Sequence, residues 1–135
     1  MTQLFQELST YPDAGIFILR FMFGIIFLYH GTPKLFNATR RAGFVGLLQS
    51  QGFPVPAVFG LIVGVVECLG GLAVLLGVWV GPAALLIAMV MLVALWLKVC
   101  TWKKSFSGDG GYEFDLILLA VALALIFLGP GSWTF

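Results

Sequence analysis

The residues of this sequence that can do chemistry are a few ionisable side chains set among long apolar runs. Carboxylates and a histidine can accept and release protons, and basic or phenolic side chains can donate hydrogen bonds to an apolar ligand with carbonyl groups, such as a quinone. We expect catalysis from His30, Lys34, Glu113 and Asp115, and cofactor contacts from Arg20, Glu67 and Tyr112.

Glu67 is the most demanding of these residues, because it is the only charged side chain between Val55 and Leu97. A carboxylate in hydrocarbon is costly unless it is paired, protonated or hydrated. Two interpretations stay open: a device that packs one helix on another, or a contact to a proton, a quinone or a substrate. A carboxylate with a cationic partner stays ionised and is mainly architectural, whereas an unpaired one can carry a proton.

Helical spacing suggests a partner for Glu67. Residues at about 100° intervals form two stripes rich in glycine, and small residues in a stripe let two helices approach closely. At about 1.5 Å per residue, Arg20 lies roughly 9 Å and Glu67 roughly 14 Å below the outer ends of their helices. The reach of arginine covers the difference, so we predict an Arg20–Glu67 ion pair. The stripes are Arg20, Gly24, Phe27, Gly31 and Lys34, and Gly60, Gly64, Glu67 and Gly71.

A second group of ionisable residues gathers toward the opposite ends of the predicted helices. His30 and Lys34 are four residues apart on one helix, and Glu113 and Asp115 open another. Acids in a first turn also satisfy free amide groups and the helix dipole, and Lys98 can extend to the interface. For His30, a structural hydrogen bond and a proton-transfer or ligand role both stay open.

No metal or phosphate motif accompanies these residues. Cys68 and Cys100 are far apart, and they form neither a CxxC pair nor a metal pattern with the single histidine. The segment 108–111 lacks the Lys-Ser/Thr of a phosphate loop and is typical of a turn. We therefore expect no metal site, and structural or inert roles for both thiols.

The elements that carry these residues are predicted to be membrane-spanning helices. The chain has 135 residues, of which 61% are apolar and 10% charged, whereas soluble domains carry about 25% charged residues. A span needs about 20 mainly apolar residues, and four such runs use most of the chain. We expect one all-α domain over residues 1–135, an antiparallel bundle of four transmembrane helices in a lipid bilayer. With a net charge of +1 and no basic stripe, nothing indicates a nucleic-acid partner.

Turn signals divide the chain into four spans, at about residues 14–36, 56–76, 83–99 and 112–128. Residues 1–13 are expected to be a polar lead-in, in which Pro12 and Asp13 favour the start of a helix. Residues 37–51 carry apolar side chains at helical spacing, so we predict a short amphipathic helix in the interface. Outside the spans, basic residues lie only in the loops after the first and third spans, with Lys34 and Lys98 at the edges of these loops. This predicts cytoplasmic loops and periplasmic termini.

Three segments resemble the DoxX family of small bacterial membrane proteins. They are FLYHGTPKLF (27–36), GVVECLGGL (64–72) and GYEFDL (111–116), in the family's order and spread over nearly the whole chain. The resemblance implies a four-helix protein of the bacterial inner membrane. By motif it implies functional positions at His30, Gly31, Lys34, Glu67, Tyr112, Glu113 and Asp115. The chain has no closely spaced cysteine pair, which argues against a self-contained dithiol relay.

The resemblance also implies a redox-linked role. Some members are subunits of a thiosulfate:quinone oxidoreductase, and others are linked to membrane-associated redox and detoxification complexes. We therefore expect a membrane subunit of a redox-linked complex, with a quinone as cofactor and with a redox protein or a second copy of the chain as partner. Two other classes stay open: a small-molecule binder or transporter, and a structural assembly partner without catalysis of its own.

Overall fold

The chain folds entirely into helices. The computed structural model describes residues 1–135 and contains six α-helices, one short π-helical segment and no strand. The predicted all-α class is therefore confirmed. The elements are α1 (Thr2–Leu8), α2 (Pro12–Phe36), α3 (Ala38–Ser50), α4 (Pro56–Leu76), α5 (Val80–Trp96), η1 (Leu97–Thr101) and α6 (Glu113–Leu128).

Three helical segments are long and apolar enough to cross a membrane: Pro12–Phe36, Pro56–Leu76 and Val80–Thr101. This confirms a polytopic helical membrane protein. The last helix, α6, has 16 residues. At 1.5 Å per residue it would be about 24 Å long, shorter than the hydrocarbon layer of about 30 Å. A fourth span therefore stays a prediction.

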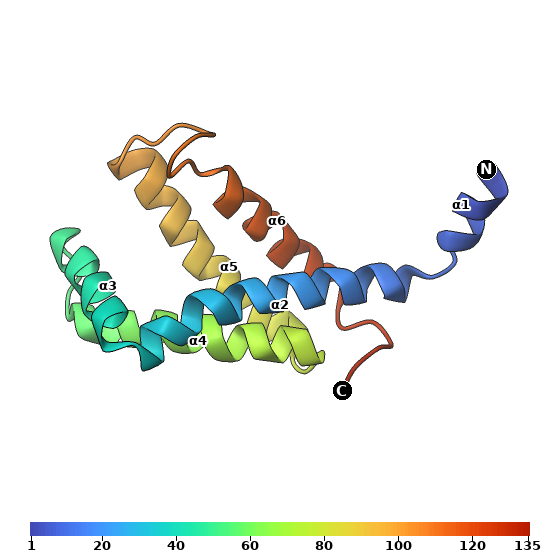
Figure 1. Cartoon of the computed structure of the whole chain (residues 1–135), viewed down its shortest axis with the longest axis horizontal. Coiled ribbons are helices and arrows are strands. Elements are labelled where there is room, and N and C mark those ends of the chain that lie inside the picture. The colour runs from blue at the N-terminus through green and yellow to red at the C-terminus, as the bar shows by residue number, and fades with distance from the viewer.

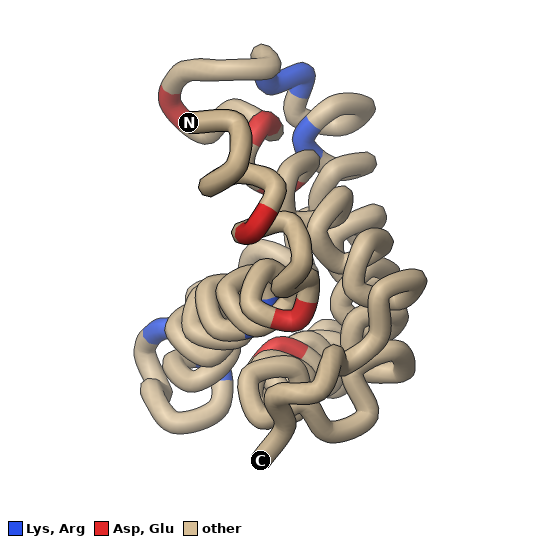
Figure 2. Tube along the Cα trace, turned by 90° about the vertical axis from the view of Figure 1, so that its right-hand side faces the viewer, with Lys and Arg blue, Asp and Glu red and all other residues tan.

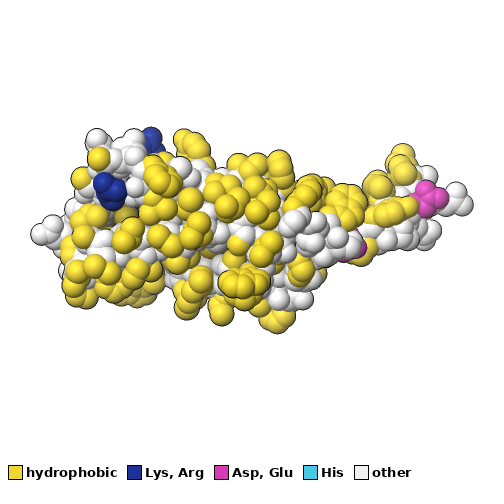
Figure 3. Space-filling view, turned by 90° about the horizontal axis from the view of Figure 1, so that it is seen from below, with side chains coloured by type: hydrophobic (Ala, Val, Ile, Leu, Met, Phe, Trp, Pro, Cys, Tyr) yellow, Lys and Arg dark blue, Asp and Glu magenta, His cyan; other side chains and the backbone are white.

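Two antiparallel helix pairs make up the body of the molecule (Figure 1). The α2–α4 pair lies along the long axis, and the α5–α6 pair is inclined to it and meets it near the start of α5 (Figure 1). Phe27, Val74, Ile87 and Leu125 belong to the core where the pairs meet. Only 24 of 135 residues are buried, because most large apolar side chains cover the flanks, as lipid solvation requires (Figure 3).

The helix boundaries follow the turn residues. α2 begins at Pro12 rather than at residue 14. Proline suits the first turn because the amide hydrogen that it lacks would have no partner within the helix there. α5 begins at Val80 rather than at residue 83, directly after Trp79, whose left-handed φ of 49° ends the preceding turn. Its π-helical continuation extends to Thr101. The boundaries of α4 are as predicted, and α6 begins one residue later than predicted, at Glu113.

The segment between the first two spans forms the predicted short helix. The Asn37 side chain caps α3 by accepting a hydrogen bond from the Arg40 amide at 3.1 Å. Leu48 is buried and Phe44 is half-buried. The lead-in differs from the prediction, since its residues Thr2–Leu8 form helix α1, which projects away from the body (Figure 1).

Candidate functional site

A seam of glycines sets the distance and the register between α2 and α4. A Cβ atom on Gly24 would lie 2.7 Å from the carbonyl oxygen of Gly71, and one on Gly31 would overlap the backbone of Cys68. A Cβ atom on Gly64 would lie 3.2 Å from the Cβ of Lys34. The two predicted stripes therefore face each other, and the absence of side chains lets the backbones touch.

This register places Lys34 against Glu67. The Lys34 Nζ atom lies 2.5 Å from Glu67 Oε2, and the side chains are 19% and 7% exposed. Phe44 of α3 covers the pair, with its ring centroid 4.4 Å from Nζ, which is within range of a cation–π interaction. Three helices thus converge on one largely buried ion pair. Phe44 was not among the predicted site residues, because the sequence does not show onto which helix α3 folds.

The predicted Arg20–Glu67 ion pair is wrong. Arg20 lies level with Val74 and Leu75 near the end of α4, about two helical turns from Glu67. The depth estimate assumed that α2 and α4 end at the same level in the membrane, whereas α2 extends further. Lys34 lies on the same predicted stripe as Arg20, and pairing the glycines of the two stripes would have indicated it as the partner.

Arg20 instead joins the end of α4 to the C-terminal tail. Its side chain is fully buried and donates four hydrogen bonds to main-chain carbonyl oxygens. Nε binds Val74 at 2.9 Å and Nη2 binds Leu75 at 3.0 Å, while Nη1 binds Pro130 at 2.7 Å and Trp133 at 2.6 Å. The first two carbonyls belong to the last turn of α4, where a cation also complements the helix dipole. Every nitrogen of the guanidinium is engaged, so Arg20 has a structural role here.

A second ion pair joins η1 to the first turn of α6. Lys98 Nζ lies 2.5 Å from Asp115 Oδ2, and the side chains are 24% and 11% exposed. Lys98 therefore has a specific partner instead of only extending to the interface. Glu113, also in the first turn of α6, is exposed and forms no ion pair.

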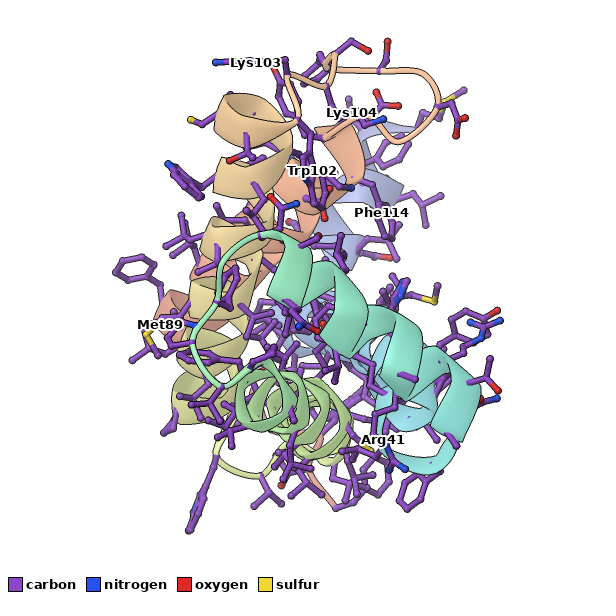
Figure 4. All side chains as sticks on the ribbon, turned by 90° about the vertical axis from the view of Figure 1, so that its left-hand side faces the viewer. Arg41, Met89, Trp102, Lys103, Lys104 and Phe114 are labelled. Atoms are coloured by element: carbon purple, nitrogen blue, oxygen red, sulfur yellow. The ribbon has the colours of Figure 1, made fainter.

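His30 and Tyr112 lie outside both ion pairs. The His30 ring is exposed, with ring centroids 5.8 Å from Tyr29 and 6.5 Å from Phe114. Phe114 lies near the top of the bundle in Figure 4, below the loop that carries Lys103 and Lys104. The Tyr112 ring packs against Phe106 with a centroid distance of 5.5 Å. The four predicted catalytic residues therefore do not converge on one point. Lys34 and Asp115 belong to two separate ion pairs, and His30 and Glu113 belong to neither.

Cys68 adds a thiol to the seam beside Glu67. Its Sγ atom lies 3.8 Å from Thr32 Oγ1, and it is half-buried, whereas Cys100 is exposed. No group of three or more His, Cys, Asp or Glu side chains converges on a point that would suit a metal ion. The Lys34–Glu67 pair places a hydrogen-bond donor and a carboxylate acceptor side by side in this seam.

The apolar flanks, the spanning helices and the intramembrane charge pairing define a polytopic α-helical membrane protein. The DoxX family matches residues 15–98, and the chain belongs to this family. The matched region includes Lys34 and Glu67 and ends at Lys98, before the Asp115 partner.

Two relatives cover most of the chain. It is 27% identical over 114 residues to "Putative oxidoreductase CatD" of Bacillus subtilis, covering 84% of this chain and 79% of the relative. It is 30% identical over 129 residues to "Uncharacterized membrane protein Rv3486" of Mycobacterium tuberculosis, covering 89% of this chain and 78% of the relative. No solved structure matches the chain.

Proposed function

We propose that the chain is the inner-membrane subunit of a redox-linked complex and that its Lys34–Glu67 pair contacts the head group of a quinone. The observation that carries the proposal is this largely buried pair under an aromatic ring, at the junction of three helices. The similarity to a relative named as an oxidoreductase supports it.

The residues around the pair fit a quinone. A quinone head group presents carbonyl acceptors on a flat apolar ring, so it needs a hydrogen-bond donor beside an apolar wall. Lys34 supplies the donor and Phe44 supplies an apolar ring over it, while Leu35 lies against Gly64 in the same seam. Glu67 supplies a carboxylate within hydrogen-bond distance of the same ammonium group. This combination provides both orientation and a site for proton exchange.

Each residue has a distinct task in this proposal. Lys34 donates a hydrogen bond to a carbonyl oxygen and so holds the head group in place. If Lys34 turned to the quinone, Glu67 would lose part of its ion pair, and it would take protons from water one at a time and pass them to the oxygens of the reduced head group. A bound quinone supplies the capacity to accept two electrons and two protons. The two electrons come from thiosulfate or from a thiol, and this donor is oxidised. A partner protein holds the donor.

Turnover in membranes tests this function. Membranes from cells that lack the chain are complemented with the wild type or a variant, and the thiosulfate- or thiol-dependent reduction of a short-chain quinone is followed. We expect Lys34→Met and Glu67→Gln each to lower the rate by about tenfold or more, in line with the loss of a positioned acid–base group. The matched control is Lys103→Met, which removes an exposed lysine and should leave the rate unchanged.

Two outcomes would overturn the proposal. One is a wild-type rate in both variants at equal protein level. The other is a rate that does not depend on the chain at all. If the chain then still captured a redox enzyme in equimolar amount, an assembly role would replace the redox role.

A further inference from the structure

A shallow hollow lies on the outside of the corner between α2 and α3, and the Lys34–Glu67 pair does not use it. It is on the face of α2 that points away from the glycine seam, since Tyr29 is 70% and Phe36 79% exposed while Gly31 is buried. The residues that line it are Tyr29, Thr32, Pro33, Phe36, Asn37 and Arg40.

The positive charge at this corner is not neutralised by the protein. Arg40 and Arg41 form no ion pair, because the two ion pairs of the chain involve Lys34 and Lys98. Arg41, labelled in Figure 4 at the corner, donates one hydrogen bond from Nη1 to the carbonyl oxygen of Leu35 at 2.9 Å. Arg40 is exposed at the edge of the hollow, with no hydrogen-bond partner for its side chain.

The hollow lies at the depth of lipid head groups. The spanning helix α2 ends at Phe36, and α3 follows after a single residue, so the corner marks the edge of the hydrocarbon layer. Tyr29 and Phe36 belong to the apolar span, whereas Asn37 and Arg40 lie beyond its end. An amphiphile with an anionic head and an apolar chain matches this gradient of polarity.

We propose that this hollow binds the phosphate head group of an anionic phospholipid, with Arg40 as its main charge partner and Arg41 as a second one. The aromatic side chains at Tyr29 and Phe36 contact the first part of the acyl chain. Such a lipid would fix the corner that places α3, and therefore Phe44, over the Lys34–Glu67 pair. Binding itself does not depend on the redox function proposed above.

Lipid retention tests the site. The full chain is assembled into nanodiscs of equal parts phosphatidylglycerol and phosphatidylcholine, released, and the retained lipids are counted by native mass spectrometry. We expect the wild type to retain phosphatidylglycerol preferentially, and Arg40→Gln, which leaves the Arg41–Leu35 bond intact, to lower that preference about fivefold. Arg40→Gln combined with Arg41→Gln should bring the ratio to that of the bulk lipid.

The matched control removes the same charge elsewhere. Lys103→Gln combined with Lys104→Gln should leave the preference unchanged, because those lysines lie in the loop after η1, away from the hollow. An equal loss in this control, or an unchanged preference in the double arginine variant, would overturn the proposal. The final experiment adds excess inorganic phosphate to the wild type as a competitor. If it displaced the retained phosphatidylglycerol completely, the site would bind a soluble anion and the lipid assignment would be wrong.

Discussion

Lys34 and Glu67 are each costly in the membrane, but together they form a neutral unit. The carboxylate side chain is only 7% exposed, and the ammonium group 2.5 Å away is its partner charge. Breaking a buried pair by removing one partner is strongly destabilising, whereas removing both charges is much less so. The stability of variants at this pair therefore tests the Lys34–Glu67 contact independently of any redox activity.

The stability of variants at this pair follows from that asymmetry. We expect Glu67→Gln and Lys34→Met each to lower the free energy of unfolding by about 2 kcal/mol. In Glu67→Gln the loss is limited because the unpaired Lys34 side chain is partly exposed. The double variant should lose less than the sum of the two, by at least about 1 kcal/mol. Unfolding in sodium dodecyl sulfate, followed by circular dichroism, measures all three. Strictly additive losses would contradict the ion pair.

A separate prediction concerns Arg20, which donates to four carbonyl oxygens rather than to a carboxylate. Arg20→Met leaves these acceptors without a donor, and we expect a loss of about 3 kcal/mol or more. Arg20→Lys should rescue little, since lysine lacks the planar fork. The tail from Pro130 onward should become open to carboxypeptidase in both variants. A tail that stays protected in Arg20→Met would show that this arginine does not hold it.

The glycine seam is the element-scale feature on which the site depends. Gly31→Ala would drive a methyl group into the backbone of Cys68, so α2 and α4 must separate. We expect a loss of about 1–3 kcal/mol, the usual cost of overpacking, and a weaker Lys34–Glu67 contact. Thermal unfolding in detergent measures the loss.

Gly15 offers a control on the same helix. A Cβ atom there would meet nothing within 4 Å, so Gly15→Ala should be neutral or slightly stabilising, because alanine favours helix. If Gly31→Ala were as harmless as Gly15→Ala, the close approach of α2 and α4 would be contradicted.

At the scale of elements, the sequence was enough to predict which faces of α2 and α4 meet, but not the register in which they meet. Stripes at helical spacing identified Gly24, Gly31, Gly64 and Gly71 as residues of a close interface, and all four are buried there. The level at which two helices meet depends on their relative sliding, which hydropathy does not encode. For this reason the glycines were predicted correctly while Arg20 was assigned to the wrong partner.

The whole molecule separates its basic loops from its termini. α3 and the loop after η1 lie toward one end, and both termini lie toward the other (Figure 1). Apart from Arg20, which binds the C-terminal tail, lysine and arginine form two groups, one around α3 and one in and beside the loop after η1 (Figure 2). This arrangement fits the orientation that we predict, with both loops cytoplasmic and both termini periplasmic.

Cys100 reports on this orientation without any added tag. It is exposed in η1, close to Lys103 and Lys104. A membrane-impermeant maleimide should label it in inside-out vesicles and not in intact spheroplasts, and Cys100→Ser should abolish the labelling. Labelling of Cys100 in intact spheroplasts would reverse the predicted topology.

The fold class could be predicted at this scale because apolar runs of spanning length leave few alternatives. Details set by tertiary contacts could not. The return of the tail to Arg20 and Asp13 depends on polar side chains that meet only after the helices pack. Helix α1 and the π-helical turn at Lys98 also lack a strong sequence signal, since short helices depend on their surroundings more than on propensity.

The affinity of the chain for a short-chain quinone, measured with a double-mutant cycle at Lys34 and Glu67, tests the central claim most directly. Binding to the full chain in nanodiscs is followed by tryptophan quenching. We predict that Lys34→Met and Glu67→Gln each weaken binding about tenfold, and that the double variant is weakened by less than the product, with a coupling of about 1 kcal/mol. Lys103→Gln, in the loop after η1, should bind as the wild type does. Equal affinity in all variants, or the same loss in Lys103→Gln, would contradict a quinone site at this pair.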